Sequence, residues 1–270
     1  MFSTYAQTDA RAARVGLLRH PLRGWSAEGR RADRAELDQA LGTLATLVRA
    51  MPRTSVHAVV SRDVRPGTLA RLARAGCRFE VSSPAQVDAC MLAGALPDDI
   101  SYRSSRLQRH EVSAAASRGI TRYVFSRRSA IQRLAAFAPH ASVVCRLRSH
   151  PCGLGWALPD PNSSPAWEGL ELLETAAAAG LQVAGVQIPL TCDHDHPQPV
   201  SKPVRDAAQV FLGLRRRDLA PRLVDLGRLP QQISRSRSLD AYARAMQEAL
   251  EDAFGADQPR ITVGLRVARR

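Results

Sequence analysis

The sequence predicts an α/β protein, a single-domain (β/α)8 TIM barrel with an N-terminal amphipathic helix. Three observations support this fold class. Eight strand candidates alternate with helical segments along 270 residues, several helices are followed by glycine, and there is no Gly-rich dinucleotide fingerprint or P-loop. Together they favour a closed barrel over an open doubly wound sheet.

Residues 1–30 are predicted to form a polar, arginine-rich lead-in, and residues 31–270 the barrel. The barrel begins with a predicted amphipathic helix over Arg34–Ala50, because Leu37, Leu41, Leu44 and Leu47 recur at helical spacing. The chain stops directly after the eighth strand candidate, so we expect no further domain.

Short apolar segments predict the strands of the barrel. They are Val56–Ser61, Arg78–Ser82, Ile100–Ser104, Arg122–Ser126, Ser142–Leu147, Gln182–Leu190, Arg222–Leu226 and Arg260–Leu265. The intervening helices are predicted at Gly67–Ala75, Ala85–Ala93, Arg109–Ser117, Ser129–Phe137, Trp167–Ala179, Val204–Arg216 and Leu239–Phe254. Glycines that favour a left-handed helix stop follow several of them, at Gly76, Gly94, Gly119, Gly180 and Gly255.

Two long loops rich in proline follow predicted strands, at Ser149–Ala166 and Thr191–Pro203. In a barrel of this type, loops that follow strands lie at the C-terminal face, where functional sites are found. We therefore expect the site at that face.

The net charge of +13 comes from 38 basic residues, of which only Lys202 is a lysine. The arginines are scattered along the chain rather than clustered on one helix, which disfavours nucleic acid and favours an anionic partner or an acidic protein surface. No apolar run reaches the length of a membrane span, and no signal peptide precedes the barrel, so a cytoplasmic location is expected. The five cysteines form no paired framework and are predicted to be free thiols.

Ordered segments between Leu37 and Arg266 resemble the barrel domain of the pyridoxal-phosphate-dependent ornithine/diaminopimelate/arginine decarboxylases, the alanine-racemase-like fold type. The segment His57–Asp63 is similar to the family's Tyr-Ala-Val-Lys-Cys-Asn-Asp, and Gly76–Ser83 is similar to its Gly-Ala-Gly-Phe-Asp-Cys-Ala-Ser. Ile100–Tyr102, Tyr123–Phe125 and Val144–Leu147 resemble its third, fourth and fifth strands.

The resemblance implies a cofactor lysine that this chain lacks. Val60 stands where the family has the lysine that holds pyridoxal phosphate as a Schiff base, which requires a primary amine. Pro189 stands where the family has a histidine that stacks on the pyridine ring. The family's glycine-rich phosphate turn is reduced to Gly227-Arg228-Leu229, and its Glu-Pro-Gly-Arg to Val263–Arg266 without the carboxylate. The family's C-terminal β domain, which completes its two-subunit active site, has no counterpart in this sequence.

What remains of the family's site is predicted to be a remnant cofactor or anion site at Glu80, Arg146, Gly227, Arg228 and Arg266. The alternative is that these residues are only charges at the barrel rim. If the site binds an anion, Arg228 substitutes a side-chain charge for lost backbone donors.

Cys192, His194 and His196 are a candidate metal site, with His150 and Cys152 as possible further ligands. The alternative is a plain solvated loop. A Cys/His nucleophile pair, Cys152 or Cys192 with His150, lacks a third orienting group.

The leading hypothesis is a catalytically degenerate decarboxylase homologue, a pseudoenzyme that serves as a binding, partner or regulatory subunit. The expected partner is a homologous active decarboxylase or a second copy of the chain. A second hypothesis is an enzyme with replaced chemistry that uses a metal or an acid/arginine site at the barrel mouth. The third is an active decarboxylase with pyridoxal phosphate, or another phosphate-bearing ligand, held non-covalently.

Overall fold

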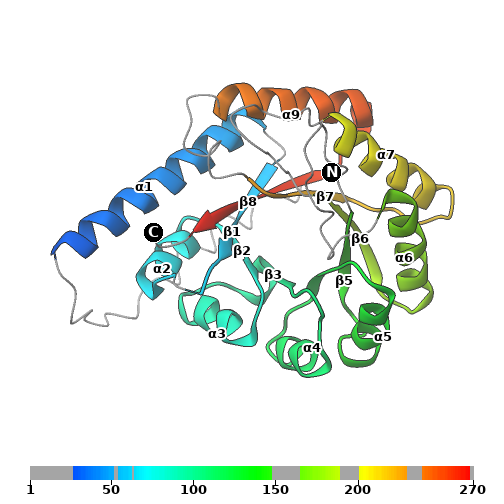
Figure 1. Cartoon of the computed structure of the whole chain (residues 1–270), viewed down its shortest axis with the longest axis horizontal. Coiled ribbons are helices and arrows are strands. Elements are labelled where there is room, and N and C mark those ends of the chain that lie inside the picture. The colour runs from blue at the N-terminus through cyan, green and yellow to red at the C-terminus, as the bar shows by residue number, and fades with distance from the viewer. Residues whose placement is uncertain are drawn as a thin grey trace, which may run out of the picture. The chain divides into compact units, whose positions relative to one another are not determined.

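The predicted barrel is confirmed. The computed structural model describes residues 27–51, 54–62, 64–147, 165–188, 201–229 and 239–267, and residues 36–270 form one compact unit. Within the described residues, eight parallel strands pair in chain order and close through β1 and β8 (Figure 1). The strands are β1 (Thr54–Val60), β2 (Arg78–Val81), β3 (Ile100–Arg103), β4 (Arg122–Phe125), β5 (Ser142–Arg146), β6 (Gln182–Gln187), β7 (Leu223–Arg228) and β8 (Arg260–Val267).

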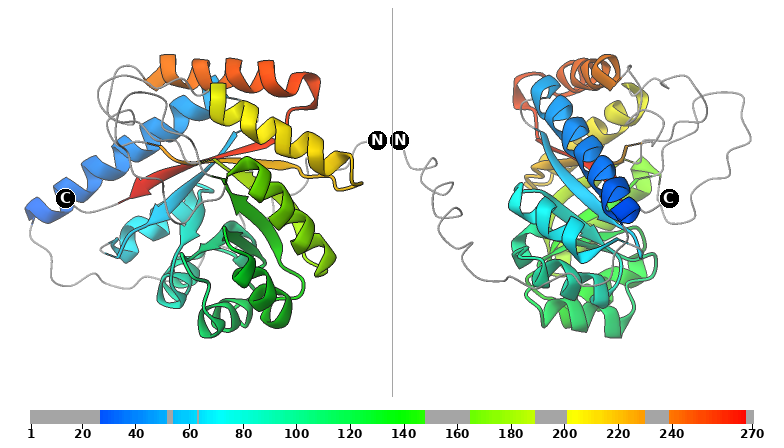
Figure 2. Two further views of the ribbon diagram at one scale, coloured as in Figure 1. Left: turned by 45° about the vertical axis from the view of Figure 1, so that its right-hand side comes forward. Right: turned by 90° about the vertical axis from the view of Figure 1, so that its left-hand side faces the viewer.

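Helices lie outside the ring of strands, as the rotated views also show (Figure 2). They are α1 (Ala27–Ala50), α2 (Pro66–Arg74), α3 (Pro84–Leu92), α4 (Arg109–Ala116), α5 (Arg128–Phe137), α6 (Ala166–Ala178), α7 (Ser201–Arg215) and α9 (Leu239–Phe254), with 3-10 turns η2 (Pro97–Asp99) and η3 (Gly255–Asp257). No helix among the described residues is long and apolar enough to cross a membrane.

The predicted helix stops are confirmed by the backbone. All five glycines have a positive φ, between +57° and +97°, which a residue with a Cβ adopts only at a steric cost. At the start of α3, the Ser83 hydroxyl accepts a hydrogen bond from the Gln86 amide, and at the start of α4 Gln108 and Glu111 form a capping box.

The main core lies between the strands and the helices. Strand side chains that alternate toward the helices are fully buried there, among them Phe79, Tyr102, Tyr123 and Val143. The rings of Tyr102 and Tyr123, on neighbouring strands, lie 6.0 Å apart. Because the outward face of the sheet is apolar and covered, polar side chains on the strands are directed to the barrel interior.

The described cysteines, Cys77, Cys90 and Cys145, are buried free thiols, as the sequence predicts. Burial raises the pKa of Cys77 to about 11, so its reactive thiolate form is disfavoured. The remaining two cysteines lie outside the described residues.

One irregularity interrupts the barrel. Val143 pairs with Val183, but Val144 pairs with Gly185, so Ala184 is an extra residue in β6. This is a β-bulge, and it lets β6 approach β7 closely at Gly185.

Candidate functional site

Polar side chains from five strands meet inside the barrel. They are His57 on β1, Glu80 on β2, Arg103 on β3, Gln187 on β6 and Asp225 on β7, called here the interior cluster. All but Arg103 are buried, and the Arg103 side chain is only 22% exposed. Parallel pairing places the side chains of Gln187 and Asp225 next to each other on the same face of the sheet.

Glu80 is the centre of the interior cluster. Arg103 Nε donates to Glu80 Oε1 over 2.8 Å, and Gln187 Nε2 donates to Glu80 Oε2 over 3.2 Å. His57 Nε2 lies 3.6 Å from the same Oε2. A buried carboxylate therefore has a cation, an amide donor and a titratable imidazole around it.

Asp225 extends the cluster to β7. Gln187 Nε2 also donates to Asp225 Oδ2 over 2.9 Å, so one amide group bridges two carboxylates. The other oxygen, Oδ1, accepts a 2.7 Å hydrogen bond from the backbone N–H of Gly227. Both oxygens of the Asp225 carboxylate therefore accept hydrogen bonds from within the chain.

The charges of the cluster depend on one another. Burial opposes ionisation of Glu80, but the adjacent His57 and Arg103 outweigh it and hold its pKa at about 2. Burial also opposes protonation of His57, yet the charges of Asp225 and Glu80 raise its pKa above its ordinary value. For Asp225, burial dominates and raises the pKa. Glu80 is therefore negatively charged at neutral pH.

The raised pKa of His57 predicts a pH-dependent stability. Protonated His57 stabilises the fold fully below the pKa of an unfolded histidine, about 6.5, and this contribution is lost as pH rises through the folded pKa. Urea unfolding between pH 6 and 8.5 should therefore show a stability decrease that His57→Gln removes. The exposed His140→Gln variant should keep the wild-type slope. An unchanged slope in His57→Gln would contradict the assignment.

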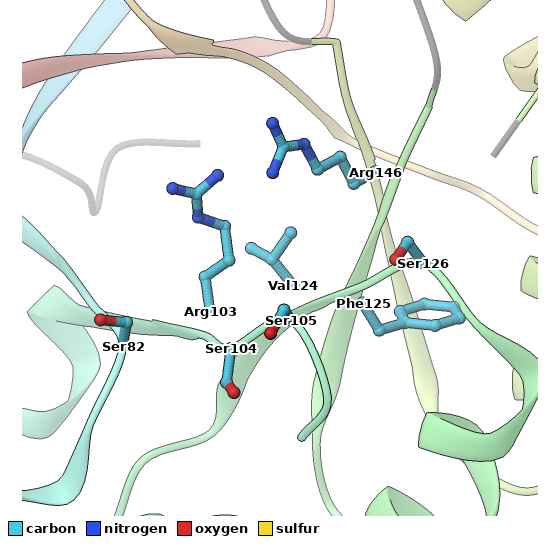
Figure 3. A pocket seen from close by; sticks show the side chains of 8 residues that line it. All are labelled: Ser82, Arg103, Ser104, Ser105, Val124, Phe125, Ser126 and Arg146. Atoms are coloured by element: carbon cyan, nitrogen blue, oxygen red, sulfur yellow. The ribbon is translucent and has the colours of Figure 1, made fainter. Parts of the chain in front are cut away.

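A pocket lies above the cluster, at the C-terminal ends of β2 to β5. It has a volume of about 330 Å³ and is lined by four serines together with Arg103, Val124, Phe125 and Arg146. Figure 3 shows the guanidinium groups of Arg103 and Arg146 directed into the same space. Because Arg103 also binds Glu80, it connects the pocket to the interior cluster.

Comparison with known proteins finds similarity to one family over part of the chain. Residues 40–156 match the family model of the pyridoxal-dependent decarboxylase, pyridoxal binding domain. Over these residues the barrel is similar to the pyridoxal binding domain of pyridoxal-dependent decarboxylases. A lysine/ornithine decarboxylase of Selenomonas ruminantium is 28% identical over 170 residues, which are 62% of this chain and 41% of that protein. The chain therefore spans less than half of the curated relative it matches.

Solved structures agree on the fold. The lysine decarboxylase of Selenomonas ruminantium superposes with a TM-score of 0.73 at 21% identity, covering 85% of this chain and 60% of that one. The Paramecium bursaria Chlorella virus arginine decarboxylase bound to agmatine gives 0.76 at 16% identity, covering 85% and 62%. The resemblance predicted from the sequence and the predicted fold are both confirmed.

The decarboxylase family has a lysine on its first strand, but neither face of β1 in this chain carries a lysine. Val59 pairs with Glu80 and shares its inward face, whereas Val60, aligned above with the family's lysine, lies in the core on the helix-facing side. The one lysine of the sequence, Lys202, is on α7, half exposed and 3.1 Å from Asp206. Strand β1 therefore offers no primary amine for a Schiff base to pyridoxal phosphate.

At the position that resembles the family's phosphate turn, the backbone is also hydrogen-bonded to a side chain of the same protein. The N–H of Gly227, which has φ +64°, is bonded to Asp225 and is not free for a phosphate oxygen. On the adjacent β8, a Cβ at Gly264 would lie 2.7 Å from His57 Nε2. The imidazole thus fills the space that Gly264 leaves. These described residues do not fit a covalently held pyridoxal phosphate.

The other predicted site residues are only partly brought together. Glu80 and Gly227 are linked through Gln187 and Asp225. The positive charge of the exposed Arg228 helps lower the pKa of Glu80, whereas Arg146 is in the pocket. The Arg266 side chain lies outside the described residues.

The predicted metal ligands Cys192, His194 and His196 lie outside the described residues, as do His150 and Cys152. Instead, ligand atoms of His57, Glu80 and Asp225 lie within 4.8 Å of one another. Four residues of the interior cluster were not predicted from the sequence: His57, Arg103, Gln187 and Asp225. The available signal was a polar residue within an otherwise apolar strand, as in Val56-His57-Ala58 and Val224-Asp225-Leu226.

Proposed function

We propose that this chain is a catalytically degenerate decarboxylase homologue whose barrel acts as a binding or partner subunit. The observation that carries the proposal is the hydrogen bond from Gly227 N–H to Asp225, at the position resembling the family's phosphate turn. It is supported by the absence of lysine from the strands of the barrel. In place of cofactor-binding groups, the interior has an ionic cluster whose two carboxylates are bonded within the chain.

Several cofactor-binding groups of the family are missing at once, and this favours a binding role over an enzyme with a slower reaction. The lysine, the phosphate donors and the pyridine carboxylate each contribute separately, and each such group is typically worth orders of magnitude in rate. The partner proposed is a homologous active decarboxylase or a second copy of the chain. The family resemblance supports this choice, since the family builds its active site from two subunits.

Absorption spectroscopy tests the proposal. Purified protein mixed with pyridoxal phosphate should show no aldimine band in the visible range, and borohydride should leave no cofactor attached. The Selenomonas ruminantium lysine/ornithine decarboxylase serves as the positive control. A band that borohydride fixes in place, or turnover of lysine or ornithine, would refute the proposal. Co-elution with an active decarboxylase or a dimer mass in light scattering would support the partner role.

An enzyme with replaced chemistry is the second candidate, and one observation favours it. His57, Glu80 and Asp225 are residue types that bind divalent metals, and they converge in the barrel. Against it, the Gln187 amide bridges both carboxylates and Arg103 pairs with Glu80, so a cation would have to displace internal donors. Near-stoichiometric metal in the same purified protein would favour this alternative.

A further inference from the structure

We infer that the side of the barrel formed by α4, α5 and α6 is a self-association surface for a second copy of this chain. The two copies are related by a two-fold axis that runs along α5, so that α4 of each copy faces α6 of the other. The inference deepens the proposed partner role and rests on it, because it selects the second copy and names the surface. Figure 1 shows the three helices side by side, and α5 packs against both of its neighbours.

The surface between α4 and α5 is basic. Arg106 and Arg109, called here the basic side, are exposed at the start of α4. Arg133 Nη2 on α5 donates to the carbonyl oxygen of Arg106 over 2.9 Å, and the Arg109 guanidinium lies 4.8 Å from the centroid of the Phe137 ring, so both arginines border α5. Glu111, the one acidic residue of the two helices, is used in the capping box of α4. Among the described residues, neither arginine of the basic side forms an ion pair.

Helix α6 carries the opposite charge. It contains three glutamates and no basic residue. Glu174 pairs with Arg217 over 2.6 Å, whereas Glu168 and Glu171 form no ion pair within the described part of the chain. Trp167 is 67% exposed beside them. Tryptophan is enriched at interfaces, where burial of its ring contributes much of the affinity. Trp167, Glu168 and Glu171 are called here the acidic side.

The outer surface of α5, between the two sides, is uncharged along its middle. Its exposed residues there are Gln132 and Ala136, one turn apart. A residue on a two-fold axis meets its own copy, so a charge at this place would repel itself, whereas an amide and a methyl group do not. Arg128, at the start of α5, lies about 140° around the helix from Arg133 and therefore on the side that faces α6 rather than on the axis.

A two-fold rotation about an axis parallel to α5 brings opposite charges together twice. The helices of a barrel all begin at the same end, so α4 of one copy meets α6 of the other at the same level. Arg109 is the first residue of α4 and Trp167 the second residue of α6. One face of the exposed Arg109 guanidinium lies over Phe137, and the other face is available for the Trp167 ring of the second copy.

The presence of both charges on one side of the barrel favours a second copy over a separate acidic protein or a nucleic acid. Either of those partners would use Arg106 and Arg109 but would leave the exposed tryptophan and glutamates of α6 without a role. A second copy uses both sides at once, and the opposite charges fix how the two copies are oriented.

Sedimentation velocity over a range of protein concentrations tests the surface. The wild-type chain should dimerise at low salt, with a dissociation constant that rises as NaCl screens the charges. Trp167→Ala should raise this constant at least about tenfold, because the symmetry removes the ring from both contacts. Arg71→Glu/Arg244→Glu, at exposed positions of α2 and α9, is the matched control and should dimerise as wild type.

Charge reversal on each side identifies the contact. Arg106→Glu/Arg109→Glu and Glu168→Lys/Glu171→Lys should each be monomeric, because like charges then meet at both contacts. An equimolar mixture of these two variants should dimerise again, since each contact of the mixed dimer then joins one positive and one negative side. This recovery would also show that both variants are folded.

Three results would overturn the inference. They are a wild-type monomer at protein concentrations up to about 100 μM, a dimer that both charge reversals leave intact, and folded monomeric variants that do not recover in the mixture. Binding of DNA by a wild-type monomer would assign the basic side to nucleic acid instead. A pyridoxal phosphate aldimine would refute the proposed function whatever the oligomeric state, so the two failures are distinguishable.

Discussion

Glu80→Gln is expected to lower the free energy of unfolding by about 3 kcal/mol, because it leaves the Arg103 guanidinium without its buried partner. The substitution keeps the volume of the side chain, so the loss reports charge rather than a cavity. Glu80 is 4% exposed, and solvent screens the interaction little. Urea unfolding at pH 7 measures the effect.

A matched control variant and a double variant test whether loss of the Glu80–Arg103 ion pair causes the destabilisation. Glu248→Gln, at an exposed position of α9, should change stability by less than about 0.5 kcal/mol. The double variant Glu80→Gln/Arg103→Leu should be at least about 1 kcal/mol more stable than the sum of the single changes predicts. Additive losses would show that the ion pair does not stabilise the cluster.

Gly185→Ala should destabilise the barrel by about 3 kcal/mol, at the upper end of overpacking changes. A Cβ at this position would lie 1.8 Å from the carbonyl oxygen of Leu223, which is a backbone atom of the paired strand β7. Relief requires a shift of β6 against β7, which are paired at Gly185 and Leu223. Thermal unfolding followed by circular dichroism measures the change.

Gly42→Ala is the control for Gly185→Ala. Gly42 is exposed in α1, and a Cβ there would have no atom within 4 Å. Because alanine favours helix over glycine, this variant should gain up to about 1 kcal/mol. Equal effects at the two glycines would show that steric contact with Leu223 is not the cause at position 185.

Much of the fold follows from local sequence patterns. Glycine stops and apolar periodicity locate all eight strands and the helices between them within a few residues. The errors are at element ends. The predicted first strand begins at Val56, whereas β1 begins at Thr54, because Thr54 and Ser55 pair with Ile261 and Thr262 of β8. Pairing with the far end of the chain has no local signal, so periodicity does not detect it.

The candidate site follows from the sequence only in part. Glu80 and Arg146 are predicted, but their contacts are not, since Glu80 meets Gln187 across 107 residues. Arg103 was not recognised because it ends a short strand, where an arginine is equally consistent with a solvated rim.

The sequence by itself determined the number and order of the β/α units, the resemblance to the decarboxylase family, and the absence of a lysine from the strands of the barrel. Only the tertiary structure decided which face of each strand points inward. Both faces of a parallel barrel strand are buried, so Val59 and Val60 are indistinguishable in sequence, although one faces Glu80 and the other the helices. Closure of the ring then brings inward polar residues from distant strands together, because alternate side chains of all eight strands share one interior.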